Sequence, residues 1–159
     1  MSNLNNIGLD KDKSGKLSEK LGVLLASYTV FYQNTRGYHW NIKGKNFFEL
    51  HVKFEELYND LFVKIDDVAE RILTLGFTPE HRYSEYVSKS LIEESRKVTD
   101  GEKAIDEILD AFKALITLQR EILDLSDEAD DEGTNAMMSD YITEQEKLVW
   151  MYSSYAHKQ

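Results

Sequence analysis

Residues 46–76, NFFELHVKFEELYNDLFVKIDDVAERILTLG, carry the clearest structural pattern in the chain. Apolar residues recur at intervals of three and four, as they do along one side of an α-helix. Asn46 is a favourable N-cap, and Gly76, with Pro79 just beyond, is typical of a helix end. We therefore expect one long helix whose buried face carries Phe47, Leu50, Phe54, Leu57, Leu61, Ile65, Val68, Ile72 and Leu75.

Three further segments, over residues 17–38, 105–122 and 138–152, show the same helical spacing. The chain has one proline and eight glycines and no sustained alternation of apolar and polar residues, so strands are not expected. The long link before the third of the four helices has room for a short extra helix over residues 83–91. The predicted fold class is all-α: a ferritin-like four-helix bundle with a short extra helix in the connection between the second and third helices.

Size and composition narrow the class of protein. A chain of 159 residues is most simply one domain, expected over residues 17–159 after a flexible polar tail, residues 1–16. The lack of cysteine excludes disulfides and thiolate metal sites. No signal-peptide core and no apolar run of about 20 residues is present, so we expect a cytoplasmic protein with no membrane contact. The net charge of −10 argues against general affinity for phosphate backbones and suits a surface that attracts cations.

The helix over residues 46–76 has a second, mixed face. On a helical wheel, its histidine and three of its carboxylates fall about 60° to 160° to one side of the apolar stripe; they are His51, Glu55, Asp66 and Glu70. Apolar residues, among them Phe62 and Leu73, share this face. A merely solvated face would not carry them, so it is expected to meet another surface. The alternative is an ordinary charged surface with a few packed histidines.

One metal ion cannot contact both ends of this face on one chain. The pair His51 and Glu55 is separated from the pair Asp66 and Glu70 by roughly 16 to 28 Å along the axis. Two copies packed antiparallel about a two-fold axis remove the difficulty, because the pairs are placed symmetrically about a point between Asp60 and Leu61. Such a dimer would contain two identical sites.

His39 joins the candidate site because a short link returns the chain antiparallel and brings His39 alongside His51. Two imidazoles with three carboxylates suit Fe(II), and also Zn(II), Mn(II) or Co(II). Redox-active iron is the sharper hypothesis. Trp40 follows His39 and is expected beside the site, where it shields the metal or serves as a sacrificial electron donor; simple interface packing is the alternative.

The segments HWNIKGKNFFELHVKFEELY and DDVAERILTLG resemble the Dps family, the mini-ferritins named as DNA-binding proteins from starved cells. In that family a histidine before Trp-Asn is followed 12 residues later by a second histidine, then by an acidic residue four further on, then by an Asp and a Glu. These roles fall on His39, His51, Glu55, Asp66 and Glu70. Glu55 departs from the aspartate common in the family, and its extra methylene shifts the carboxylate outward.

The resemblance implies a homo-dodecamer built from two-fold dimers. It also implies that two-iron ferroxidase centres at subunit interfaces oxidise Fe(II), preferably with hydrogen peroxide, and that the hollow shell stores ferric oxyhydroxide. Such a protein protects the cell against oxidative damage. An ordinary ferritin would instead hold its iron within one bundle through Glu-x-x-His motifs, and the chain contains none. Two competing hypotheses are a DNA-compacting protective shell and an acidic structural bundle without metal.

Two further features have competing interpretations. The acidic run over residues 124–132 is either a solvated turn or the lining of three-fold pores, for which Asp130 and Asp131 are the candidates; Glu56 is a candidate for mineral nucleation on the inner wall. Three lysines near the N-terminus are largely offset by neighbouring aspartates, so DNA binding is expected to be weak or absent. His81 and His157 lie in polar settings and are expected to be exposed.

Overall fold

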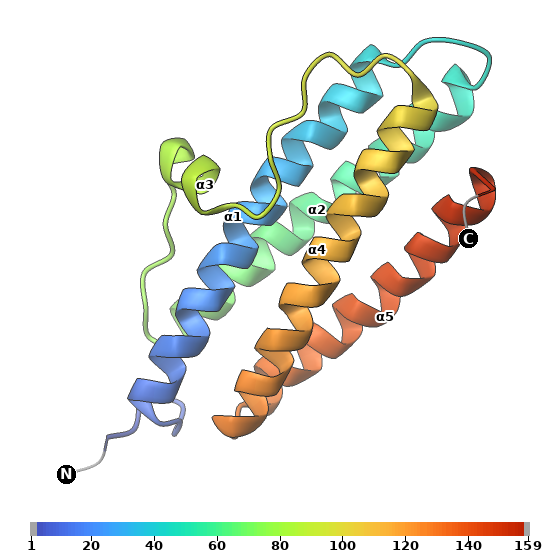
Figure 1. Cartoon of the computed structure of the whole chain (residues 1–159). Coiled ribbons are helices and arrows are strands. Elements are labelled where there is room, and N and C mark those ends of the chain that lie inside the picture. Colours follow the sequence, from blue (N-terminus) through green and yellow to red (C-terminus); the bar gives the residue numbers. More distant parts are fainter. Residues whose placement is uncertain (1–2, 158–159) are drawn as a thin grey trace.

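The computed structural model describes residues 3–157 and is built from helices (Figure 1). The elements are α1 (Lys11–Asn41), α2 (Phe47–Thr74), α3 (Tyr83–Lys89), α4 (Gly101–Glu128) and α5 (Glu132–Tyr155). Within the described residues, extended structure is limited to two isolated bridges, Leu4 with Asp10 and Lys43 with Asp100. The predicted all-α class is confirmed, and the expected extra helix is α3.

The connection that carries α3 sets the topology of the bundle. α1 and α2 form one antiparallel pair, and α4 and α5 form the other (Figure 1). Residues 75–100 lead the chain back along the bundle past α1, so α2 and α4 run in the same direction. This is the long crossover that distinguishes ferritin-like bundles from simple up-and-down bundles. None of the helices within residues 3–157 is long and apolar enough to span a membrane.

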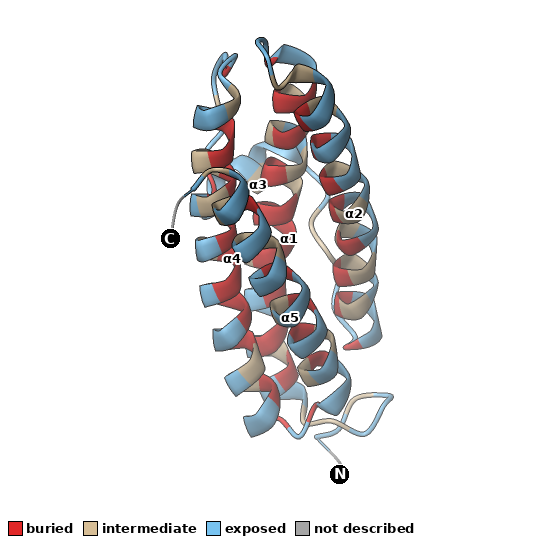
Figure 2. Cartoon of the chain, turned by 90° about the vertical axis from the view of Figure 1, so that its right-hand side faces the viewer, coloured by how far each residue is buried: buried red, intermediate tan, exposed pale blue. Residues whose placement is uncertain are grey.

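The core is formed by the inward faces of the four long helices (Figure 2). Seven of the nine apolar residues predicted for the buried face of α2 are buried, and Phe47 and Ile65 pack against the core partly buried. Aromatic rings join the helices across the core, since Phe31 of α1 meets Phe112 of α4 edge to face at 5.3 Å between centroids. The helical periodicity therefore identified the core face correctly.

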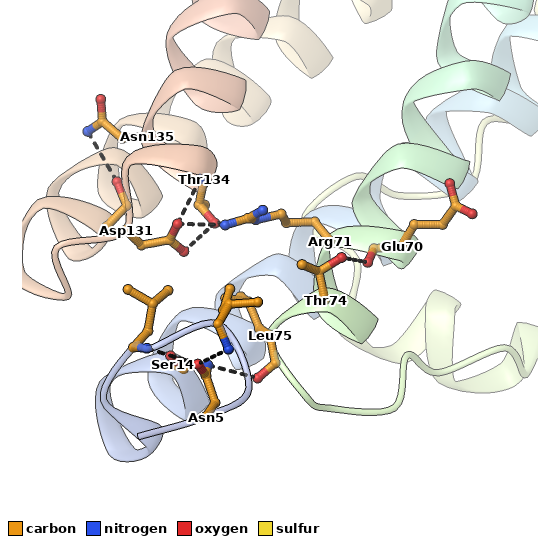
Figure 3. Close-up of polar contacts among 12 residues, drawn as sticks. Asn5, Ser14, Glu70, Arg71, Thr74, Leu75, Asp131, Thr134 and Asn135 are labelled. Atoms are coloured by element: carbon orange, nitrogen blue, oxygen red, sulfur yellow. Dashed lines mark hydrogen bonds and ion pairs between the residues drawn. The ribbon is translucent and has the colours of Figure 1, made fainter. Parts of the chain in front are cut away.

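The start of α1 differs from the sequence prediction. Residues 11–16, placed in a tail by the sequence pattern, are helical, because the Asp10 carboxylate accepts a hydrogen bond from the Lys13 amide and caps the helix. The preceding segment is held against the bundle by Asn5, whose side chain donates to the Leu75 carbonyl at 3.4 Å (Figure 3). Residues 1–2 of the expected tail and 158–159 of the expected domain lie outside the described part.

Asp131, one of the two residues of the acidic run predicted to line a pore, has a different role in the structure. Asp131 is 2% exposed, caps α5 through the Thr134 amide and accepts a 2.6 Å hydrogen bond from the Arg71 guanidinium (Figure 3). Arg71 also donates to Thr134 Oγ1 at 2.9 Å, so the end of α2 is bonded to the start of α5. Asp131 is therefore a structural residue and no pore lining, whereas Asp130 is exposed, with φ of 55°.

Candidate metal centre

His39 and His51 are stacked face to face, with ring centroids 3.7 Å apart and an angle of 11° between planes. His39 Nδ1 lies 2.6 Å from the His51 carbonyl oxygen, and His51 Nδ1 lies 2.7 Å from the His39 carbonyl oxygen. A carbonyl oxygen can only accept, so both Nδ1 atoms donate. In each neutral ring the remaining lone pair is then on Nε2, the arrangement by which proteins orient histidines that bind metals.

The hairpin between α1 and α2 brings the two histidines together. His39 lies in the last turn of α1 and His51 near the start of α2, with residues 42–46 between them. The reversal needs φ of 113° at Gly44, whose carbonyl accepts from the Phe47 amide at 3.1 Å. The juxtaposition expected from the short link is therefore present in the structure.

Two aromatic residues hold the imidazoles in place. Phe47 stacks on His51 at 4.8 Å between centroids, and the Tyr58 ring meets His39 edge to face at 5.4 Å. The sequence pattern assigned Phe47 to the core, but it did not show that Phe47 or Tyr58 touches a histidine. The available signal was the spacing of Phe47, one helical turn before His51.

Glu55 is the third candidate ligand that one chain brings next to the two histidines. Its Oε1 lies 3.7 Å from His39 Nε2, on the side of the ring that the backbone hydrogen bond leaves free. The histidine side chain is 8% exposed, whereas the glutamate side chain is 54% exposed. One chain therefore presents the buried imidazole of His39 and the partly buried imidazole of His51 beside a carboxylate at the protein surface.

Asp66 and Glu70 are not brought to the histidines within one chain. Both are exposed further along α2, and the Glu70 side chain points away from the Arg71 contacts (Figure 3). Among residues 3–157, no group of three or more His, Cys, Asp or Glu side chains is placed to hold a metal ion. The five predicted ligands thus form two separate groups: His39 of α1 with His51 and Glu55 near the start of α2, and Asp66 with Glu70 further along α2.

This surface also carries large apolar side chains. Phe62 is 62% exposed and Leu73 56% exposed, and on a helical wheel both fall among the candidate ligands. Phe62 leans toward the α1 side, where its ring centroid is 6.1 Å from that of Tyr32. Trp40 is exposed next to His39, with the Arg36 guanidinium 4.8 Å from its ring centroid. An exposed face of this composition is typical of a protein contact.

The interior of the bundle does not fit a pair of metal ions. Di-iron proteins of ferritin-like fold place two Glu and two Glu-x-x-His motifs there. Here Tyr28 donates to Gln119, Gln119 donates to Gln145 at 2.7 Å, and Gln145 donates to the Tyr28 oxygen at 2.6 Å. Burial raises the pKa of Tyr28 well above its ordinary value, so its phenol stays protonated. The two glutamine amides carry no charge, so the whole ring of hydrogen bonds is neutral.

Comparison with known proteins agrees with this geometry. The model of the ferritin-like domain matches residues 18–159. A DNA protection during starvation protein of Porphyromonas gingivalis is 41% identical over 151 residues, which cover 95% of each protein. General stress protein 20U of Bacillus subtilis is 35% identical over 142 residues, covering 89% of this chain and 98% of that protein.

Solved structures give the same result. The Dps protein of Vibrio cholerae O1, described as a member of a broad superfamily of ferritin-like diiron-carboxylate proteins, superposes with a TM-score of 0.95 at 54% identity, covering 98% of both chains. Dps of Staphylococcus aureus has a TM-score of 0.85 at 33% identity, covering 88% of this chain and 94% of that one. The chain therefore belongs to the Dps family of ferritin-like proteins.

Proposed function

We propose that this protein is a ferroxidase and iron store whose reaction sites lie between two copies of the chain. Each site would combine the two histidines and Glu55 of one protomer with Asp66 and Glu70 of its partner, and Trp40 would lie at its rim. The observation that carries the proposal is the pair of bonds that fixes both histidines with Nε2 available for a metal. The exposed apolar side chains of α2 supply the contact surface.

The donor set suits the oxidation of iron. Imidazole nitrogens hold Fe(II), and carboxylate oxygens favour the harder Fe(III) product. When two Fe(II) ions each give one electron to hydrogen peroxide, the O–O bond breaks and two protons are taken up to form two water molecules. This balance releases no hydroxyl radical, so the reaction protects against oxidative damage. Zn(II) or Mn(II) could bind in place of iron but would not supply these electrons.

The family and the separation of the two ligand groups along α2 support the assembly that we propose. A two-fold dimer completes two sites, and a cytoplasmic homo-dodecamer of such dimers would enclose the space in which ferric oxyhydroxide is stored. In this proposal, exposed Asp130 lines a pore through which Fe(II) enters the shell. Exposed Glu56, whose carboxylate lies 2.9 Å from the Lys53 ammonium, nucleates the ferric mineral on the inner wall.

The reaction is tested by adding Fe(II) and then peroxide under anaerobic conditions and following ferric absorbance. The wild-type protein should oxidise iron rapidly, and His39→Ala should abolish the rapid phase because it removes one fixed imidazole. His81→Ala is the matched control, since His81 is exposed and distant along the chain. Slow oxidation by a correctly assembled wild-type protein would instead favour an acidic structural bundle.

DNA binding is the second role to be tested, since relatives are named for DNA protection. Lys11, Lys13 and Lys16 begin α1 beside two aspartates, and the net charge of the chain is −10. In a gel-shift assay we expect no stable complex at about 150 mM salt, because phosphate contacts weaken steeply with salt. A tight complex at that salt, lost when the three lysines are changed to glutamine, would favour the DNA-compacting shell.

A further inference from the structure

A polar layer crosses the centre of the bundle, and every long helix contributes to it. The closed ring of hydrogen bonds described above joins Tyr28 of α1, Gln119 of α4 and Gln145 of α5. The Tyr28 ring meets Tyr141 of α5 edge to face at 6.2 Å between centroids. Tyr141 in turn lies under an ammonium group from α2, because Lys64 Nζ is 4.9 Å from its ring centroid.

Lys64 is a buried cation with two carboxylate partners. Its side chain is 5% exposed, and its Nζ donates to both Asp60 oxygens, at 2.8 and 2.9 Å. The same nitrogen lies 2.9 Å from Glu144 of α5. Both carboxylates are more exposed than the ammonium, so the positive charge lies inside and the negative charges lie toward solvent.

We infer that the Lys64 ammonium replaces a metal ion as the cation of the bundle interior and thereby keeps divalent cations out of it. The hydrogen-bonded ring of Tyr28, Gln119 and Gln145 is neutral. A further carboxylate, Asp67 of α2, lies toward Tyr141. The Lys64 ammonium is therefore the positive charge that Asp60 and Glu144 share. A divalent cation could enter only by displacing a covalently attached charge. It follows that iron binds only between protomers, and this consequence rests on the function proposed above.

The size of the space between the carboxylates and their charge both support the inference that the Lys64 ammonium stands where a divalent cation would bind. Oxygen ligands surround Mn(II) or Mg(II) at slightly over 2 Å, and three carboxylate oxygens already surround Nζ at 2.8 to 2.9 Å. If the ammonium is removed, two carboxylates from α2 and α5 face each other with no positive charge between them. Their repulsion in a partly buried place is relieved most directly by a divalent cation.

The test compares Lys64→Met with Lys53→Met, both in a His51→Ala background that disables the proposed interface site. Lys53 is the matched control because it lies on the same helix and pairs with Glu56 at 2.9 Å, but its side chain is 45% exposed. Binding is measured as the loss of the electron paramagnetic resonance signal of free Mn(II). Lys64→Met should gain one site per chain, at least about tenfold tighter than any site of the control. Adding Asp60→Asn should remove the gain.

Two outcomes would overturn the inference. One is equal Mn(II) binding by the two methionine variants. The other is failure of both Lys64→Met and Lys64→Gln to fold at any Mn(II) concentration, because a replaceable cation would restore them. Failure of the proposed ferroxidase site is distinguishable, since it alters wild-type iron oxidation but leaves the difference between these variants unchanged.

Discussion

Asp66→Ala should slow Fe(II) oxidation as severely as His51→Ala, although the two side chains lie far apart on one chain. Both residues are ligands of the same proposed site, one from each protomer. Each loss should cost at least the roughly 10- to 100-fold seen when a group that supports a metal ligand is removed. The measurement is the initial rate of ferric absorbance after peroxide is mixed with protein and about two Fe(II) per chain.

The control for this prediction is Asp67→Ala. Asp67 neighbours Asp66 but is turned about 100° away on the helix, toward Tyr141 of α5, whose pKa it helps to raise. Its loss should change the initial rate by less than about twofold. Equal slowing by both aspartate variants would indicate a general charge effect, and an unchanged rate in Asp66→Ala would remove Asp66 from the site.

Asp131→Ala should lower the free energy of unfolding by about 3 kcal/mol, the largest effect on stability that we expect from a single polar residue. The substitution removes the cap of α5 and leaves the largely buried Arg71 guanidinium without its carboxylate partner. Urea denaturation followed by circular dichroism measures the change.

Asp130→Asn is the matched control for stability. Asp130 is exposed and has φ of 55°, a conformation that asparagine adopts readily, so the expected change is within about 0.5 kcal/mol. If the Asp131 and Asp130 variants unfold at the same urea concentration, the bond between α2 and α5 does not stabilise the bundle as described.

The sequence predicted the long helices and the core face of α2 because apolar spacing is a local property of the chain. It also placed His39 near His51, since a short link between antiparallel helices leaves little freedom. The predicted start of α1 was wrong because the lysines and aspartates of residues 10–16 carry no apolar pattern. The cap that extends the helix depends on the Asp10 carboxylate, which accepts a hydrogen bond from the Lys13 amide.

Contacts between distant segments were beyond the reach of periodicity. Asp131 lies in an acidic run that resembles a solvated loop, yet Arg71, 60 residues earlier, draws it into a buried pair. Lys64 falls outside the apolar stripe and has the pattern of a surface charge, but α5 covers it with Tyr141 and Glu144. The reciprocal bonds of the two histidines depend on backbone carbonyls, which no residue pattern reveals.

The shared site is tested most directly by co-assembling His51→Ala and Asp66→Ala chains in equal amounts. In a mixed two-fold dimer one site carries both changes and the other carries neither, so random mixing should restore about a quarter of the wild-type sites. Co-assembly of His51→Ala with Glu55→Ala should restore none, because both residues come from the same protomer. Rapid oxidation at about a quarter of the wild-type amplitude in the first mixture alone is the predicted result. No recovery in that mixture, with mixed dimers shown to be present, would contradict a site built from two chains.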